Sequence, residues 1–352
     1  MTPSAPLVRR SNLGSQFGLG EKLFSSASER RFATALEEGL DAVEAGLLHE
    51  MSFADNLADV TSRYLLDAGG KRVRPTLTLL TAQLGDGNNP SVITAAESLE
   101  ITHLASLYHD DVMDEANMRR GVPTAQHVWG NSVAILTGDL LFARASKLIA
   151  SLGEGAIKLQ ADTFERLCLG QLHETIGPKD GENPIEHYIQ VLADKTGSLI
   201  AASAEMGVIF SNAPAEFRSP VKVFGEKIGI AFQLIDDVID LSDGEETGKT
   251  AGTDLRSGVA TLPLLYLRDL AATDAAAAAL LHRLESDVAD GGDTADLDAA
   301  IAELRDHEVT ARTLDEAHRW AREAVEALAP LPDGPVKKAL TRFADSIVER
   351  SN

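Results

Sequence analysis

Residues 103–121 read HLASLYHDDVMDEANMRRG, an apolar helical segment that ends in three aspartates and is followed by two arginines. Carboxylates four residues apart lie on one face of a helix and can share a hard cation. Basic groups in the next loop can hold an anion beside that cation. The residues concerned are Asp110, Asp111, Asp114, Arg119 and Arg120.

A second copy of the acidic pattern, FQLIDDVID at residues 232–240, also closes an apolar helical run. With 54 acidic residues among 352, a single match could arise by chance and mark only a solvated helix end. Both copies, however, use aspartate, a poorer helix former than the glutamate expected on an acidic surface. Both also lead into loops with basic residues. The pair predicts two helix ends that face each other, with Asp236, Asp237 and Asp240 on the second.

Charge and cysteine content limit the class of protein. The net charge of −22 argues against nucleic acid or an anionic membrane surface as a general partner, because the field of the protein would repel phosphates. An anionic substrate therefore needs a local reversal of sign. Cys168 is the only cysteine, which excludes an intramolecular disulfide, favours a cytoplasmic location and is expected to lie in the core. No apolar run is long enough to span a bilayer.

Apolar residues recur at three- and four-residue steps along most of the chain, which predicts helices. No period-two pattern of useful length suggests strands. We therefore expect an all-α fold, with a flexible arm at residues 1–20 and a single domain at residues 21–352. The main helical ranges are 21–66 (two helices), 76–84, 91–114, 133–150, 155–174, 185–210 and the run that ends at Asp240.

Three further basic residues, Lys71, Arg74 and Lys195, add to the predicted site. In GGKRVRP, residues 69–75, paired glycines permit a tight turn and Pro75 suits the first turn of a helix. Lys71 and Arg74 are three residues apart and can point toward one anion at that helix end, although a solvated basic turn is the simpler alternative. Lys195 lies in a mostly apolar helix, where it either reaches solvent or points into a polar cavity.

Together these residues indicate a site for Mg²⁺ and a diphosphate, since Mg²⁺ rarely accepts a shell made of protein atoms alone. A metal ion with arginines and lysines around it would stabilise the diphosphate as a leaving group. The sequence has no nucleophilic serine or cysteine constellation and no phosphate-binding glycine loop, so hydrolase and kinase functions lack their parts.

Several motifs in a fixed order resemble the trans-isoprenyl diphosphate synthases, most closely the long-chain polyprenyl diphosphate synthases. They are GGKRVRP, HDDVMD with RRG, KTG at 195–197, FQLIDDVID, and GKTAGTDLR at 248–256 with TLP at 261–263. The resemblance covers nearly the whole chain. It implies an antiparallel helical bundle around a deep cavity, usually a homodimer, with Mg²⁺ as the metal ion and Mn²⁺ able to substitute.

The resemblance also implies roles for individual residues. Asp110, Asp114 and Asp236 match direct metal ligands, and Asp111, Asp237 and Asp240 match residues that hold metal-bound water or basic side chains. Lys71, Arg74, His103 and Arg120 match the isopentenyl diphosphate site, whereas Arg119, Lys195 and Lys249 match the allylic diphosphate site. Thr196 and Gln233 match positions beside the reacting carbons. The family usually has a lysine where this chain has Val259, which leaves open weaker allylic binding or compensation by Arg256.

The implied reaction joins isopentenyl diphosphate to an allylic diphosphate such as farnesyl or geranylgeranyl diphosphate. Small residues before the first motif, Ala105, Ser106 and Thr102, leave room for a long product, as for a quinone side chain such as that of menaquinone. The alternative is that Leu141 or Phe142 closes the cavity and a short product results. A terpene cyclase would not need the isopentenyl site, and a non-catalytic regulatory subunit would not need intact aspartate motifs. Product release could involve a transient membrane contact.

Overall fold

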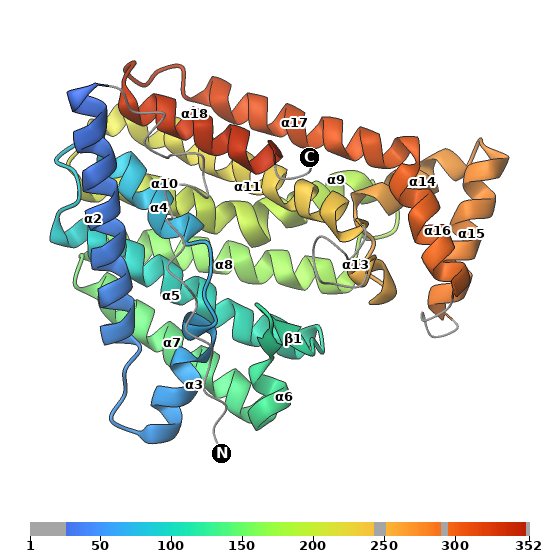
Figure 1. Cartoon of the computed structure of the whole chain (residues 1–352), viewed down its shortest axis with the longest axis horizontal. Coiled ribbons are helices and arrows are strands. Elements are labelled where there is room, and N and C mark those ends of the chain that lie inside the picture. Colours follow the sequence, from blue (N-terminus) through green and yellow to red (C-terminus); the bar gives the residue numbers. More distant parts are fainter. Residues whose placement is uncertain (1–25, 243–250, 290–294, 350–352) are drawn as a thin grey trace. The chain divides into compact units, whose positions relative to one another are not determined.

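The computed structural model describes residues 26–242, 251–289 and 295–349, and their regular structure is almost entirely helical (Figure 1). This confirms the predicted all-α class. The expected arm at residues 1–20 and Lys249 lie outside the described residues. Contacts divide the chain into two compact units.

The first unit contains the N-terminal helices and both segments of the first motif, HDDVMD and RRG. It comprises residues up to Glu165, Leu199–Gly225 and Ala327–Phe343. Its helices are α2 (Ala27–Glu50), α3 (Asn56–Asp67), α4 (Val73–Ala82), α5 (Pro90–Met113), α6 (Ala125–Trp129), α7 (Asn131–Ala150), the first half of α8 (Glu154–Ile176), nearly all of α10 (Ser198–Phe210), the start of α11 (Arg218–Asp240) and most of α18 (Pro335–Val348).

Helix α5 places the first aspartate motif. It begins after Asn89, whose side chain accepts a hydrogen bond from the Val92 N–H (3.1 Å), with Pro90 in its first turn. Buried polar groups tie it to its neighbours: Ser98 Oγ donates to the Ala145 carbonyl of α7 (3.0 Å), and the Tyr108 hydroxyl donates to a carbonyl of α3. The helix is therefore held along its length, and its acidic end has a defined position in the unit.

The second unit contains the second motif and a separate apolar core. It comprises Arg166–Ser198, Glu226–Glu326 and the chain from Ala344 onward. Side chains such as Leu234, Ile235, Leu262 and Leu267 pack in its core. Besides parts of α8, α11 and α18, its helices are α9 (Pro184–Leu192), α13 (Thr253–Arg256), α14 (Leu262–Ala271), α15 (Ala275–Ala289), α16 (Ala295–Asp306) and α17 (Glu308–Ala327).

Three local features differ from the sequence-based expectations. A small antiparallel hairpin, β1 (Met118–Arg119) and β2 (Val122–Pro123), follows the first motif, and two-residue strands are too short to show a period. The helix predicted over residues 185–210 is interrupted by a π-helical turn at Ala193–Gly197. Cys168 is exposed rather than in the core, because it lies on an outward face of α8.

None of the helices in the described ranges combines the length and the apolar character that a membrane crossing requires.

A close approach of α10 to α4 gives a test of the packing in the first unit. A Cβ added at Gly207 would lie 2.2 Å from the Thr78 carbonyl oxygen, so Gly207→Ala should lower the free energy of unfolding by about 1–3 kcal/mol. Gly155, in the first turn of α8, has open space around it, and Gly155→Ala should instead raise this free energy by about 0.5–1 kcal/mol. Thermal unfolding of both variants measures the difference, and equal midpoints would contradict this packing.

Candidate active site

The glycine-rich loop before α4 has a strained backbone. Gly69 and Gly70 have positive φ angles, and Arg72, directly before the helix, has φ 49° and ψ 38°. This left-handed conformation costs a non-glycine residue roughly 1–2 kcal/mol. Gly70 has a φ of 150°, which other residues rarely adopt, and a Cβ there would lie 2.7 Å from Arg72 Nη1, so glycine is favoured at this position. Interactions elsewhere must hold the loop in this conformation.

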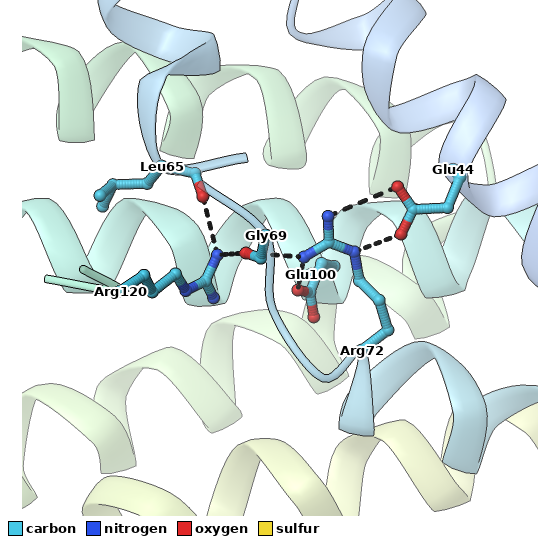
Figure 2. Close-up of polar contacts among 6 residues, drawn as sticks. All are labelled: Glu44, Leu65, Gly69, Arg72, Glu100 and Arg120. Carbon is cyan, nitrogen blue, oxygen red and sulfur yellow. Dashed lines mark hydrogen bonds and ion pairs between the residues drawn. The ribbon is translucent and has the colours of Figure 1, made fainter. Parts of the chain in front are cut away.

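Arg72 is held by two glutamates from different helices (Figure 2). Its Nε and Nη2 donate to the two carboxylate oxygens of Glu44 on α2, and its Nη1 donates to Glu100 on α5 (3.3 Å). Both Arg72 (5% exposed) and Glu100 (2%) are buried. Burial by itself lowers the pKa of Arg72, but the two carboxylates more than offset this and raise it. Arg72 is thus a buried, paired cation, whereas the side chain of Lys71 beside it is exposed to solvent.

Arg120 connects the loop after the first motif to the same glycines. Its Nη1 donates to the Leu65 carbonyl (2.8 Å) and to the Gly69 carbonyl, as Figure 2 shows. Arg120 also has a left-handed backbone, with φ 53°. Burial lowers the pKa of Arg120, and the neighbouring arginines Arg72 and Arg119 act in the same direction, while Glu100 opposes them. The guanidinium of Arg120 therefore links the loop after the first motif to Gly69, which lies 51 residues earlier in the sequence.

Positive charge surrounds His103. Burial holds the pKa of His103 well below its usual value, and Arg74, Arg120, Arg119 and Arg72 lower it further. The imidazole of His103 is therefore neutral at pH 7. Burial lowers the pKa of Arg74 to about 10, and Glu100 opposes this shift. Arg74 Nε is buried without a hydrogen-bond partner among the described residues. A donor left in this way suits an anionic ligand.

The three aspartates of the first motif have different surroundings. Asp111 is fully buried and accepts a hydrogen bond from Arg119 Nε (2.7 Å). Its second oxygen, Oδ2, is buried and unpartnered within the described part of the chain. Asp110 is partly buried and Asp114 is exposed. Burial raises the pKa of Asp111, whereas Arg119 lowers it.

The second motif repeats this division. Asp237, its middle aspartate, is buried and accepts hydrogen bonds from the Tyr188 hydroxyl (2.8 Å) and the Leu262 N–H (3.3 Å). Burial raises the pKa of Asp237 to about 8, although both hydrogen bonds lower it. Asp236 and Asp240 are partly exposed, and Asp240 Oδ2 accepts from the Asp254 N–H (3.1 Å).

The π-helical turn carries Lys195 and Thr196, both partly buried. Lys195 Nζ forms an ion pair with Glu174 of α8. Helix α8 approaches this turn closely, since a Cβ at Gly170 would lie 2.6 Å from the Lys195 backbone nitrogen. Such turns occur often at functional sites. Gln233 on α11 is also partly buried.

Arg256, considered as a substitute for the missing lysine at Val259, is already engaged. Its Nη2 pairs with Asp298, and its Nε donates to the Ala251 carbonyl (3.0 Å). Val259 is 39% exposed.

The aspartates offer the hard oxygen ligands that Mg²⁺ prefers, and the unpartnered Asp111 oxygen fits a site that gains a cation or its water. In the described part of the chain, no three His, Cys, Asp or Glu side chains gather closely enough to hold a metal ion by themselves.

The predicted chain-length residues lie in the middle of α5. Thr102 and Ala105 are buried, and Ser106 is 7% exposed. Close by, Phe142 of α7 stacks at an angle on Phe164 of α8, with ring centroids 4.3 Å apart, and contacts His109. Leu141 is fully buried.

Sequence reasoning missed four partners of these site residues, three glutamates that pair with basic groups and one tyrosine whose hydroxyl donates to Asp237. They are Glu44, Glu100, Glu174 and Tyr188. Only Glu100 had a local signal, because glutamates are unusual within a mostly apolar helical run, and Glu100 lies three residues before His103.

An all-α fold with two aspartate motifs and a cationic glycine loop defines the class of isoprenyl diphosphate synthases. A family model described as polyprenyl synthetase matches residues 55–303. Nonaprenyl diphosphate synthase of Mycobacterium tuberculosis is 43% identical over 322 residues, which cover 91% of this chain and 94% of that protein. The chain therefore belongs to the polyprenyl synthetase family, and it is a prenyltransferase.

Two solved structures agree. A decaprenyl diphosphate synthase from Rhodobacter capsulatus matches with a TM-score of 0.80 and 34% identity, covering 92% of this chain and 99% of that one. Geranylgeranyl pyrophosphate synthase from Corynebacterium glutamicum, solved with calcium and isoprenyl diphosphate, also matches with a TM-score of 0.80, at 38% identity, covering 93% of this chain and 99% of that one.

The surroundings of His103 predict its titration. Its pKa in the folded protein lies below the ordinary value of 6.5, so the protein should lose stability as the pH falls below 6.5 and His103 is forced to charge. NMR of histidine-labelled protein should show one imidazole that titrates well below the others and disappears in His103→Gln. Added inorganic pyrophosphate should raise its pKa. An unshifted His103 signal would contradict the charge cluster.

Proposed function

We propose that the protein is a long-chain trans-polyprenyl diphosphate synthase that condenses isopentenyl diphosphate head-to-tail with an allylic diphosphate, such as farnesyl or geranylgeranyl diphosphate. One observation carries this proposal. In a chain of net charge −22, Arg74, His103 and Arg120 gather around Glu100, on and beside the helix that ends in Asp110 and its motif. A cationic cluster and a carboxylate motif on one helix suit a diphosphate and its metal ion.

Each group of residues has a role in this proposal. Lys71, Arg74, His103 and Arg120 bind the isopentenyl diphosphate, and Arg119, Lys195 and Lys249 bind the allylic one. Asp110, Asp114 and Asp236 would hold Mg²⁺ directly, whereas Asp111, Asp237 and Asp240 orient other groups. The pairing of Asp111 with Arg119 and of Asp237 with Tyr188 supports this division.

The proposed condensation requires few further groups from the chain. Bound Mg²⁺ would neutralise the diphosphate and make it a better leaving group. Thr196 Oγ1 and the Gln233 amide oxygen present dipoles that stabilise positive charge on the allylic carbon. The isopentenyl double bond attacks that carbon, and the departing diphosphate accepts the proton that is then lost. No protein base is needed.

Single carboxylates of the motifs test the metal site. Asp110→Ala and Asp236→Ala should each reduce turnover about 10²- to 10³-fold, because each removes charge stabilisation at the leaving group. Asp162→Ala, an exposed aspartate on α8, serves as the matched control and should keep full activity. Incorporation of labelled isopentenyl diphosphate is measured with Mg²⁺, with Mn²⁺ and with a chelator. Full activity in the presence of the chelator would exclude a metal-dependent reaction.

The long product is supported by the names of the nonaprenyl and decaprenyl relatives and by the small residues of α5. The geranylgeranyl pyrophosphate synthase neighbour favours the alternative, a short product. In that case the cluster of Phe142 and Phe164 is the natural stop, since ring-sized side chains fill helical cores well.

Product length separates the two. With dimethylallyl, geranyl, farnesyl and geranylgeranyl diphosphates as primers, we expect products well beyond twenty carbons, and Ala105→Phe should shorten them by filling the space beside α5. Because Ala105 is fully buried, Ser106→Phe is tested as well, with thermal unfolding of both. Unchanged length in folded variants would contradict the role of these residues. No product from any primer would favour a non-catalytic regulatory subunit.

We also propose a homodimer in the cytoplasm, with transient membrane contact for product release. Exposed apolar side chains support an interface: Leu136 (65% exposed) on α7 in the first unit, and Leu172 (51%) and Ile176 (68%) on α8 in the second. Apolar side chains that follow one face of a helix often mark contacts between proteins. Light scattering in solution tests the oligomeric state.

A further inference from the structure

We propose that Glu44 is a positioning residue for isopentenyl diphosphate: through its ion pair with Arg72 it holds the loop of residues 69–74 in the conformation that presents Lys71 and Arg74 to the diphosphate. Glu100 shares this role. This inference deepens the proposed function and rests on it.

The backbone of the loop needs an external restraint. Arg72 has a left-handed conformation that arginine rarely adopts, and it follows two glycines with positive φ angles. No side-chain hydrogen bond caps α4 at this position, so local capping does not stabilise the turn. If Arg72 relaxed toward an ordinary conformation, Lys71 and Arg74 on its two sides would change direction.

The side chain of Arg72 supplies that restraint. It donates to both oxygens of Glu44, to Glu100 (3.3 Å) and to the Gly69 carbonyl (3.4 Å), the last within its own loop (Figure 2). With these partners and only 5% exposure, its guanidinium is committed to the protein. Arg72 therefore has a structural role within the basic motif that it shares with Lys71 and Arg74.

Glu44 and Glu100 differ in what they do. Glu100 also opposes the positive charge of Arg74 and Arg120, so its removal would change both the geometry and the field of the site. Among the described residues, the hydrogen bonds and the ion pair that join Glu44 to the loop all involve Arg72. Glu44 is accordingly the cleaner position for a test of positioning.

The chain offers a matched control on the same helix. Glu50, also on α2, forms an ion pair with Arg144 of α7 (3.2 Å) and has no hydrogen bond or ion pair with the described loop of residues 69–74. Glu44→Gln and Glu50→Gln each remove one carboxylate from one arginine pair of α2. Only the first should affect isopentenyl diphosphate.

Steady-state kinetics with the full chain test the positioning role of Glu44. Glu44→Gln should raise the KM for isopentenyl diphosphate about tenfold or more, with the KM for the allylic diphosphate and kcat within twofold of the unchanged protein. Glu50→Gln should leave all three unchanged. Arg72→Lys should resemble Glu44→Gln, because lysine keeps the charge but loses the two-point contact. The double variant Glu44→Gln with Arg72→Gln should be no worse than Arg72→Gln alone, because Glu44 acts through Arg72.

Two outcomes would overturn the inference: an unchanged KM for isopentenyl diphosphate in Glu44→Gln, or an equal rise in both KM values, which would indicate general loosening. Calorimetric titration with isopentenyl diphosphate provides a readout that does not need turnover. If the unchanged protein makes no product, the proposed synthase function fails, yet weaker binding in Glu44→Gln than in Glu50→Gln would still support the positioning role. Equal binding would refute it.

Discussion

Compensation of buried positive charge is the constraint on which the site depends. Arg72, Arg74 and Arg120 lie close enough to influence one another, and Glu100, itself buried, opposes the repulsion among them. Burying like charges together is costly unless carboxylates and hydrogen bonds accompany them. Burial is the main cause of the lowered pKa of His103, and the four arginines lower it further, so Glu100 does not fully cancel their charge. The remaining positive field suits a diphosphate.

Helix α5 carries Glu100 and many of the predicted site residues around it. Along one helix lie the counter-charge Glu100, the neutral His103, the small Ala105 and the aspartates that begin at Asp110. Because the helix is buried on most of its surface and tied to α7 through Ser98, these groups keep fixed spacings. A change in the packing of α5 would therefore affect several of them together.

The two aspartate motifs, each within its own unit, show the same pattern of burial and hydrogen bonding. In each, the middle aspartate is buried and accepts hydrogen bonds, Asp111 from Arg119 and Asp237 from Tyr188 and the Leu262 N–H. The outer aspartates retain exposure. Burial and hydrogen bonding therefore separate the middle aspartate of each motif from the outer two. The sequence pattern alone, with three identical side chains, does not distinguish them.

The sequence by itself determined the all-α class, both acidic helix ends and the family, since helical periodicity and residue chemistry are local properties. It did not predict the π-helical turn at Lys195, the exposure of Cys168 or the hairpin after the first motif. Tertiary structure alone decided that Arg72 is a paired structural cation and that His103 is neutral. Glu44 and Glu100 each lie 28 residues from Arg72, and only packing brings such residues together. Pairing and pKa depend on those distant neighbours, which no local pattern records.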